Sequence, residues 1–153
     1  MKKFFIISIL VLLCIFSSIP FTYASSTTVI SLSDSKITVN GETISTDTNS
    51  GVYLSNKMDN GSTSTDATRS NIEISNIFNI NSAGTYEFSG ILTNGQISIN
   101  ANNIIGEVRI VLNNVNITCK SAPAIFVYCK DTENEDCKVV IETASGSTNT
   151  IVG

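Results

Sequence analysis

Ile and Val dominate the apolar residues of this chain beyond its first 24 positions. Residues 25–153 hold 27 Ile and Val but only four Leu, and 51 of them are Ser, Thr or Asn. β-Branched side chains suit pleated strands, whereas small hydroxyl and amide side chains suit turns. No window of 11 residues in this part shows the 3.6-residue apolar period of a helix. The sequence therefore predicts an all-β fold.

The first 24 residues are predicted to be a cleavable secretion signal. Lys2 and Lys3 form a basic start, residues 4–19 are almost wholly apolar, and Thr22 and Ala24 occupy positions −3 and −1 of a cleavage site. The apolar run is shorter than the roughly 20 residues that a membrane-spanning helix needs. We therefore expect a secreted or cell-surface protein with no stable membrane insertion after cleavage.

The charge of the mature part limits its partners and its chemistry. Residues 25–153 carry seven Lys and Arg against thirteen Asp and Glu, and the chain has no His. An acidic chain is a poor partner for nucleic acid. Without His, no Ser–His or Cys–His nucleophile can form, and no spacing of carboxylates singles out a glycosidase pair. Arg109 is the residue that could act as the base of a polysaccharide lyase, but we expect it to pair with Glu87 or Glu107. We therefore expect no catalysis.

The chain divides into three predicted parts. These are the signal at residues 1–24, N-terminal strands with a polar loop or cap at residues 25–71, and the main run of strands at residues 72–153. Asn40-Gly41 predicts a tight hairpin turn. Residues 46–70 are predicted to form a long loop, because Val52-Tyr53-Leu54 is their only apolar island.

Similar segments recur after roughly 25 to 30 residues in the third part. They are residues 86–90, 110–114 and 140–143, each with a short run that holds apolar residues, and the first two end in a polar bend. This degenerate repeat fits the rungs of a parallel β-helix, in which one face of every strand packs inward. Short alternating strands fit a β-sandwich as well. The residues by themselves leave both architectures open.

Several motifs in order resemble a known family. They are the stretches 82–90, 94–99, 108–118, 122–125 and 146–150. Over residues 72–153 the chain resembles secreted carbohydrate-binding domains of clostridial type, a family first described as a domain of unknown function. The resemblance implies a right-handed parallel β-helix similar to polysaccharide lyases, bound calcium, and binding of cellulose or acidic pectin-like polysaccharide. Family members carry further rungs, so we expect this chain to be a fragment, truncated at its C-terminus.

Three cysteines remain after removal of the signal: Cys119, Cys129 and Cys137. Export favours disulfides, and Cys129 and Cys137 lie at the ends of two strand patterns, so we predict a bond between them. Three buried thiols remain the alternative. Between these two cysteines, an acidic segment offers candidate calcium ligands, with a solvated loop as the alternative: Asp131, Glu133 and Asp136. An EF-hand is excluded, because Asp136 occupies the position that needs Gly.

Candidate carbohydrate-binding residues lie along one predicted strand. Amide and hydroxyl side chains occur there at strand spacing: Asn94, Gln96, Ser98 and Asn100. Ser98 and Asn100 lie opposite the apolar Ile97 and Ile99 and are expected to face solvent. Tyr128 is a candidate stacking platform, although a structural role remains open for it. The sequence therefore predicts a secreted, non-catalytic polysaccharide-binding protein. The alternatives are a pectate-lyase-like enzyme whose active groups lie in missing rungs, and an adhesin with a rigid β spacer.

Overall fold

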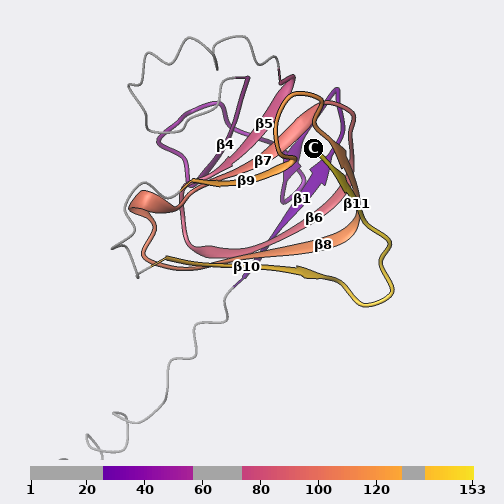
Figure 1. The fold of residues 1–153 in the computed structure, drawn as a ribbon. Helices are drawn as coiled ribbons and strands as arrows, with labels where there is room; N and C mark the ends of the chain where they lie inside the picture. The colour runs from indigo at the N-terminus through magenta and orange to yellow at the C-terminus, as the bar shows by residue number, and fades with distance from the viewer. Residues whose placement is uncertain (1–25, 57–73, 129–136) are drawn as a thin grey trace, which may run out of the picture.

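The computed structural model describes residues 26–56, 74–128 and 137–153, and within them the fold is all-β, as the sequence predicts (Figure 1). The predicted signal lies outside these residues. The elements, in chain order, are β1(Thr27–Leu32), β2(Thr38–Val39), β3(Glu42–Thr43), β4(Val52–Ser55), β5(Asn76–Ile80), β6(Gly84–Leu92), β7(Gly95–Asn100), the short 3-10 helix η2(Ala101–Asn103), β8(Gly106–Thr118), β9(Ile125–Tyr128), β10(Cys137–Thr143) and β11(Thr150–Val152). No helix in the described ranges has the length and apolar character of a membrane span.

The described strands lie in two mixed, open sheets that face each other (Figure 1). The larger sheet has the order β10-β8-β6-β1-β2-β3, and β11 also pairs with β8. The smaller sheet has the order β4-β5-β7-β9. In the larger sheet β1, β6, β8 and β10 run parallel in succession, and in the smaller sheet β5, β7 and β9 do the same.

The recurring segments lie beside one another in the larger sheet. Tyr86 of β6 is opposite Ile110 of β8, and Ile110 is opposite Ile141 of β10. The smaller sheet has a similar row, in which Phe78, Ile97 and Ile125 are in register. Because parallel partners in register present equivalent side chains to the same face, the apolar residues form continuous rows.

The core lies between the two sheets. Phe78 of the smaller sheet and Phe88 of the larger sheet meet edge to face, with ring centroids 5.1 Å apart and an interplanar angle of 82°. Both rings are fully buried. Burial of each such side chain contributes about 1.5–3 kcal/mol. The remaining core is mainly aliphatic and includes Ile30, Leu32, Ile80, Leu92, Ile97, Ile99, Val108, Ile110, Val115 and Ile117.

Gly90 and the asparagines beside it shape a bend where the larger sheet changes register. Gly90 has φ +101°, and the β6–β8 register shifts between Phe88 and Gly90. A Cβ atom at Gly90 would overlap the backbone carbonyl oxygen of Leu32. In β8, Asn114 adopts φ +59° and accepts a hydrogen bond from the backbone N–H of Thr148 over 3.1 Å. Side-chain amides thus satisfy backbone groups that the bend removes from the sheet ladder.

Two N-terminal features test the sequence predictions. Asn40 and Gly41 have φ values of +51° and +86° and connect the antiparallel strands β2 and β3, which confirms the predicted hairpin.

The prediction that Val52-Tyr53-Leu54 lies in a loop is wrong. These residues form β4, which pairs antiparallel with β5, and Tyr53 is only 1% exposed. The pairing of this short apolar segment with β5 stabilises a strand although the neighbouring sequence is polar.

Candidate functional site

The predicted binding residues lie on the face of the smaller sheet that points away from the core. Phe78 and Ile97 pack against the larger sheet, so the alternating residues in β5 and β7 point to the opposite side. The register places Asn79, Ser98 and Phe126 in one row across β5, β7 and β9. Gln96, Asn100 and Tyr128 lie on this same face, which we call the outer face of the smaller sheet.

The expectation that Gln96 and Ser98 face solvent is not met. Gln96 is fully buried and Ser98 is 2% exposed. The Gln96 side-chain amide donates a hydrogen bond to the backbone carbonyl of Pro123 over 2.7 Å. Asn79 and Tyr53 on the same face are buried too. Alternation along a strand identifies the face on which a residue lies, but not whether that face is covered.

Asn94 and Asn100 make local hydrogen bonds instead of forming an open polar row. Asn94 lies in the turn before β7, and its side-chain oxygen Oδ1 accepts a hydrogen bond from the backbone N–H of Lys120 over 3.2 Å. Asn100 ends β7 and accepts two hydrogen bonds from Asn102, one from its backbone N–H and one from its side-chain amide. Both residues are partly accessible, so Asn100 can still contact a ligand beside Tyr128, its register partner in β9.

Phe126 and Tyr128 form an aromatic pair on the edge strand β9. Their ring centroids are 6.4 Å apart and the ring planes differ by 23°, so the two rings are nearly parallel. Both residues are half-buried. Phe126 is the residue that sequence reasoning missed, and the signal was its i, i+2 spacing from Tyr128, which puts both rings on one face of a strand. Nearly parallel ring faces of this kind can stack on the C–H face of a sugar ring.

An ion-pair network occupies the outer face of the larger sheet. Arg109 contacts Glu107 over 2.7 Å and Glu142 over 2.6 Å, and Lys138 contacts Glu107 over 2.9 Å. The predicted Arg109–Glu107 pair is therefore confirmed. The alternative partner, Glu87, instead accepts a hydrogen bond from Asn113 over 2.8 Å.

This network moves the pKa values of its members away from those needed for catalysis. Hydrogen bonds from Lys138 and Arg109 lower the pKa of the Glu107 carboxyl. The hydrogen bond to Glu107 raises the pKa of Arg109, which makes its guanidinium harder to deprotonate. A general acid needs a raised carboxyl pKa, and a base must lose its proton, so neither group is tuned for proton transfer.

Stability is expected to fall at acidic pH in a manner that depends on Glu107. The pKa of Glu107 is lowered in the folded state from its ordinary value of 4.5. The ionised carboxylate therefore stabilises the fold at pH values above 4.5, and this stabilisation is lost as the pH falls through the folded-state pKa. Thermal midpoints measured from pH 7 to pH 3 should therefore decrease less steeply in Glu107→Gln than in the wild type. Glu42→Gln, at the opposite edge of the sheet, should retain the wild-type slope. Equal slopes for wild type and Glu107→Gln would contradict the expectation.

The predicted disulfide and calcium site involve residues that the structure does not describe. Cys119 is buried at the end of the β8 segment, and Cys137 begins β10. Cys129 lies outside the described residues, as do the candidate ligands Asp131, Glu133 and Asp136. The described ranges contain no group of three His, Cys, Asp or Glu that could hold a metal ion. Both assignments remain predictions.

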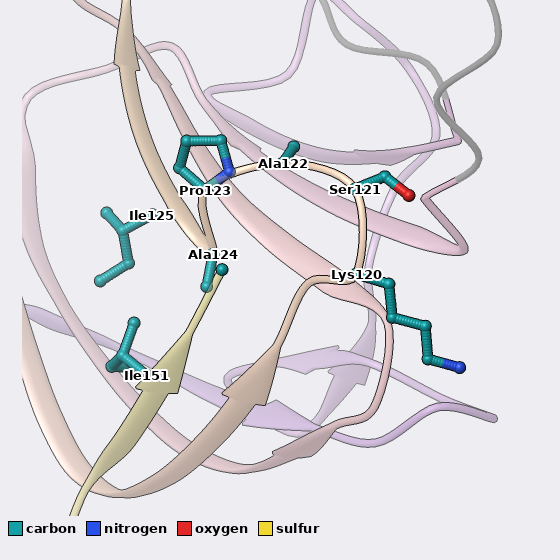
Figure 2. A pocket seen from close by; sticks show the side chains of 8 residues that line it. Lys120, Ser121, Ala122, Pro123, Ala124, Ile125 and Ile151 are labelled. Atoms are coloured by element: carbon teal, nitrogen blue, oxygen red, sulfur yellow. The ribbon is translucent and has the colours of Figure 1, made fainter.

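An open pocket of about 610 Å³ lies at the end of the space between the sheets (Figure 2). Its wall is the loop before β9 together with the end of β11, and the side chains of Ile125 and Ile151 both line it, as Figure 2 shows. Among the described residues that line it, only Lys120 and Ser121 have polar side chains. A pocket so poor in hydrogen-bonding groups is badly suited to a sugar.

The chain matches the model of a known protein family. Residues 74–153 match the model of a family described as carbohydrate-binding domain-containing protein. The matched region includes β5 to β11, and with them the aromatic pair on β9. No curated protein and no solved structure matches the chain.

Proposed function

This chain belongs to the carbohydrate-binding domain-containing family, and we propose that it is a secreted protein that binds polysaccharide without cleaving it. The family match over residues 74–153 is the observation that carries the proposal. Plant cell-wall polysaccharide, either cellulose or acidic pectin-like chains, is the proposed ligand class. The acidic segment with Asp131, Glu133 and Asp136 is proposed to bind calcium, which would bridge the protein to a uronate chain.

A right-handed parallel β-helix is the architecture proposed for this domain. The succession of parallel pairs supports it, because β6, β8 and β10 stack in one sheet while β5, β7 and β9 stack in the other. In such a solenoid each turn of chain contributes one strand to each sheet. A β-sandwich also has two facing sheets, but it is usually built from antiparallel strands.

The aromatic pair on β9 is the proposed binding platform. Phe126 and Tyr128 present two nearly parallel rings along the strand, so each ring can stack on one sugar unit of an extended chain. Asn100 lies beside Tyr128 and offers an amide to sugar hydroxyls at the edge of the platform. Stacking of this kind needs no charge on the ligand and therefore favours a neutral glucan at this position.

The absence of catalysis is supported by the state of the strongest candidate base. Arg109 is held between two carboxylates, and its pKa is raised. Glu107 and Glu142, the carboxylates nearest to it, serve as its ion-pair partners. A glycosidase would need one of its two carboxyls protonated at neutral pH, which the lowered pKa of Glu107 opposes.

Removal of either ring should weaken binding to insoluble polysaccharide. We expect Phe126→Ala and Tyr128→Ala each to reduce affinity for cellulose by about three- to tenfold, because each loses one stacking contact. Tyr128→Trp, which enlarges the platform, should retain or increase binding. The measurement is a depletion isotherm with cellulose and with polygalacturonate, each with and without a calcium chelator.

Val127→Ala is the matched control, because Val127 is exposed on the same strand but points to the opposite face. It should bind like the wild type. Loss of polygalacturonate binding on chelation, with cellulose binding unchanged, would separate the calcium-dependent site from the platform. Failure of the wild type to bind any polysaccharide would refute the proposed function, and unsaturated uronate products absorbing in the ultraviolet would refute its non-catalytic part.

A further inference from the structure

The two rings of the proposed platform on β9 have different neighbours in β7. Ser98, the register partner of Phe126, is 2% exposed. Asn100, the register partner of Tyr128, is partly accessible. Neighbouring strands lie about 4.7–4.9 Å apart, so partners on one face are within reach of the same ligand. A sugar stacked on Tyr128 therefore has an accessible amide beside it, whereas the neighbour of Phe126 is covered.

The side-chain oxygen of Asn100 is engaged by the short helix η2 that follows β7. It accepts hydrogen bonds from the backbone N–H of Asn102 over 3.4 Å and from the side-chain amide of Asn102 over 3.1 Å, and so caps η2. A backbone N–H can only donate, so this contact identifies the oxygen end of the Asn100 amide. The oxygen is therefore committed to the protein.

The nitrogen of the same amide is left for a ligand. Asn100 Nδ2 has no hydrogen-bond acceptor among the described residues. This nitrogen carries two N–H donors and no acceptor, so it recognises an oxygen that has a lone pair to offer. We infer that Asn100 is a specificity-determining residue: it donates a hydrogen bond to a hydroxyl oxygen of the sugar stacked on Tyr128, whereas the Phe126 position binds through stacking alone. The inference rests on the proposed function and names the side chain that reads the sugar.

A neutral β-linked glucan is the ligand that fits this arrangement. When the flat face of such a sugar stacks on an aromatic ring, its equatorial hydroxyls project from the edge of the sugar, roughly parallel to the ring. An axial hydroxyl points instead toward the aromatic ring or away from it. The Asn100 amide belongs to the neighbouring strand, beside Tyr128, and so meets an equatorial oxygen. Stacking and the amide together select a sugar with equatorial hydroxyls at the Tyr128 position.

Asn100→Asp tests the donor while it keeps the cap. Asp caps a helix about as well as Asn, so the bonds from Asn102 and the fold should be retained. The two N–H donors are replaced by an ionised oxygen, and affinity for cellotetraose at pH 7, measured by titration calorimetry, should fall about tenfold. At about pH 3.5, below the ordinary Asp pKa of about 3.9, the carboxyl is an O–H donor again. Affinity should then return toward the wild-type value at that pH, and a loss that persists there would overturn the inference.

Asn116→Asp is the matched control for the change of charge. Asn116 is exposed between the buried Val115 and Ile117 of β8, in the larger sheet. This variant should bind cellotetraose like the wild type at both pH values. Circular dichroism at both pH values establishes that each variant is folded. An equal loss of affinity in Asn116→Asp and Asn100→Asp would assign the effect to net charge and would contradict a role for the Asn100 donor.

Double variants show which ring the amide serves. The effect of Asn100→Asp should persist in Phe126→Ala and should disappear in Tyr128→Ala, because the amide acts on the sugar that Tyr128 holds. Equal effects in the two backgrounds would contradict the assignment to the Tyr128 position. A wild type that binds cellotetraose with the same affinity as Asn100→Asp would refute this inference alone. A wild type that binds no polysaccharide or oligosaccharide would refute the proposed function, and the inference with it.

Discussion

Replacing Gly90 with alanine is expected to lower the free energy of unfolding by about 3 kcal/mol or more. Two effects add at this position. The φ of +101° is unfavourable for any residue with a Cβ atom. The new methyl group would also overlap the backbone carbonyl oxygen of Leu32 in the neighbouring strand. Backbone atoms cannot move aside as a flexible side chain can, so β1 and β6 would have to separate.

Gly146→Ala is the matched control for this prediction. Gly146 also has a positive φ, +75°, but no atom lies within 4 Å of the position that its Cβ would take. It should therefore lose only about 1 kcal/mol, from the backbone conformation alone. Urea unfolding followed by circular dichroism gives both free energies. Equal losses in the two variants would show that the close approach of β1 and β6 at Gly90 does not contribute to the loss in free energy of unfolding.

Truncation of Phe78 to alanine is expected to cost about 3–5 kcal/mol of stability. The ring is fully buried and contacts Phe88 across the space between the sheets, so its removal leaves a cavity where the two sheets meet. Because domains of this size are stabilised by only about 5–15 kcal/mol, the variant should be close to unfolding at 37 °C. Chemical unfolding at 25 °C measures the loss.

Phe126→Ala provides the comparison for Phe78→Ala. Phe126 is half-buried on an edge strand, so its truncation should cost much less stability while it reduces polysaccharide binding. A double-mutant cycle of Phe78→Leu and Phe88→Leu should give a coupling of about 0.5–1.5 kcal/mol from the edge-to-face contact. Additive losses would mean that the two rings contribute through burial only.

Most strands could be predicted because the signal for a strand is local. The alternation of apolar and polar residues in β6 and β8 identifies each strand and its buried face. Asn40-Gly41 specifies the turn between β2 and β3 through its positive φ values. β4 was missed because its three apolar residues are too few to show a period. Its stability comes from pairing with β5, which lies more than 20 residues further along the chain.

The candidate site could be predicted only in part. Tyr128 was selected as an aromatic residue, and the i, i+2 spacing of Phe126 could have selected Phe126 too, but only the structure shows that the two rings lie nearly parallel. Gln96 and Ser98 were expected on an open face and are buried. A single strand with alternating residues has two faces, and its own sequence does not state which segments cover each one.

The sequence by itself determined that the chain forms strands, where most of them lie, and which face of each is apolar. These properties follow from side-chain branching and from the two-residue period of a strand, which are local. Only the tertiary structure decided that the recurring segments lie side by side and that polar residues such as Gln96 are buried. Those outcomes depend on contacts between residues far apart in the chain, and the period of one strand carries no information about its neighbours.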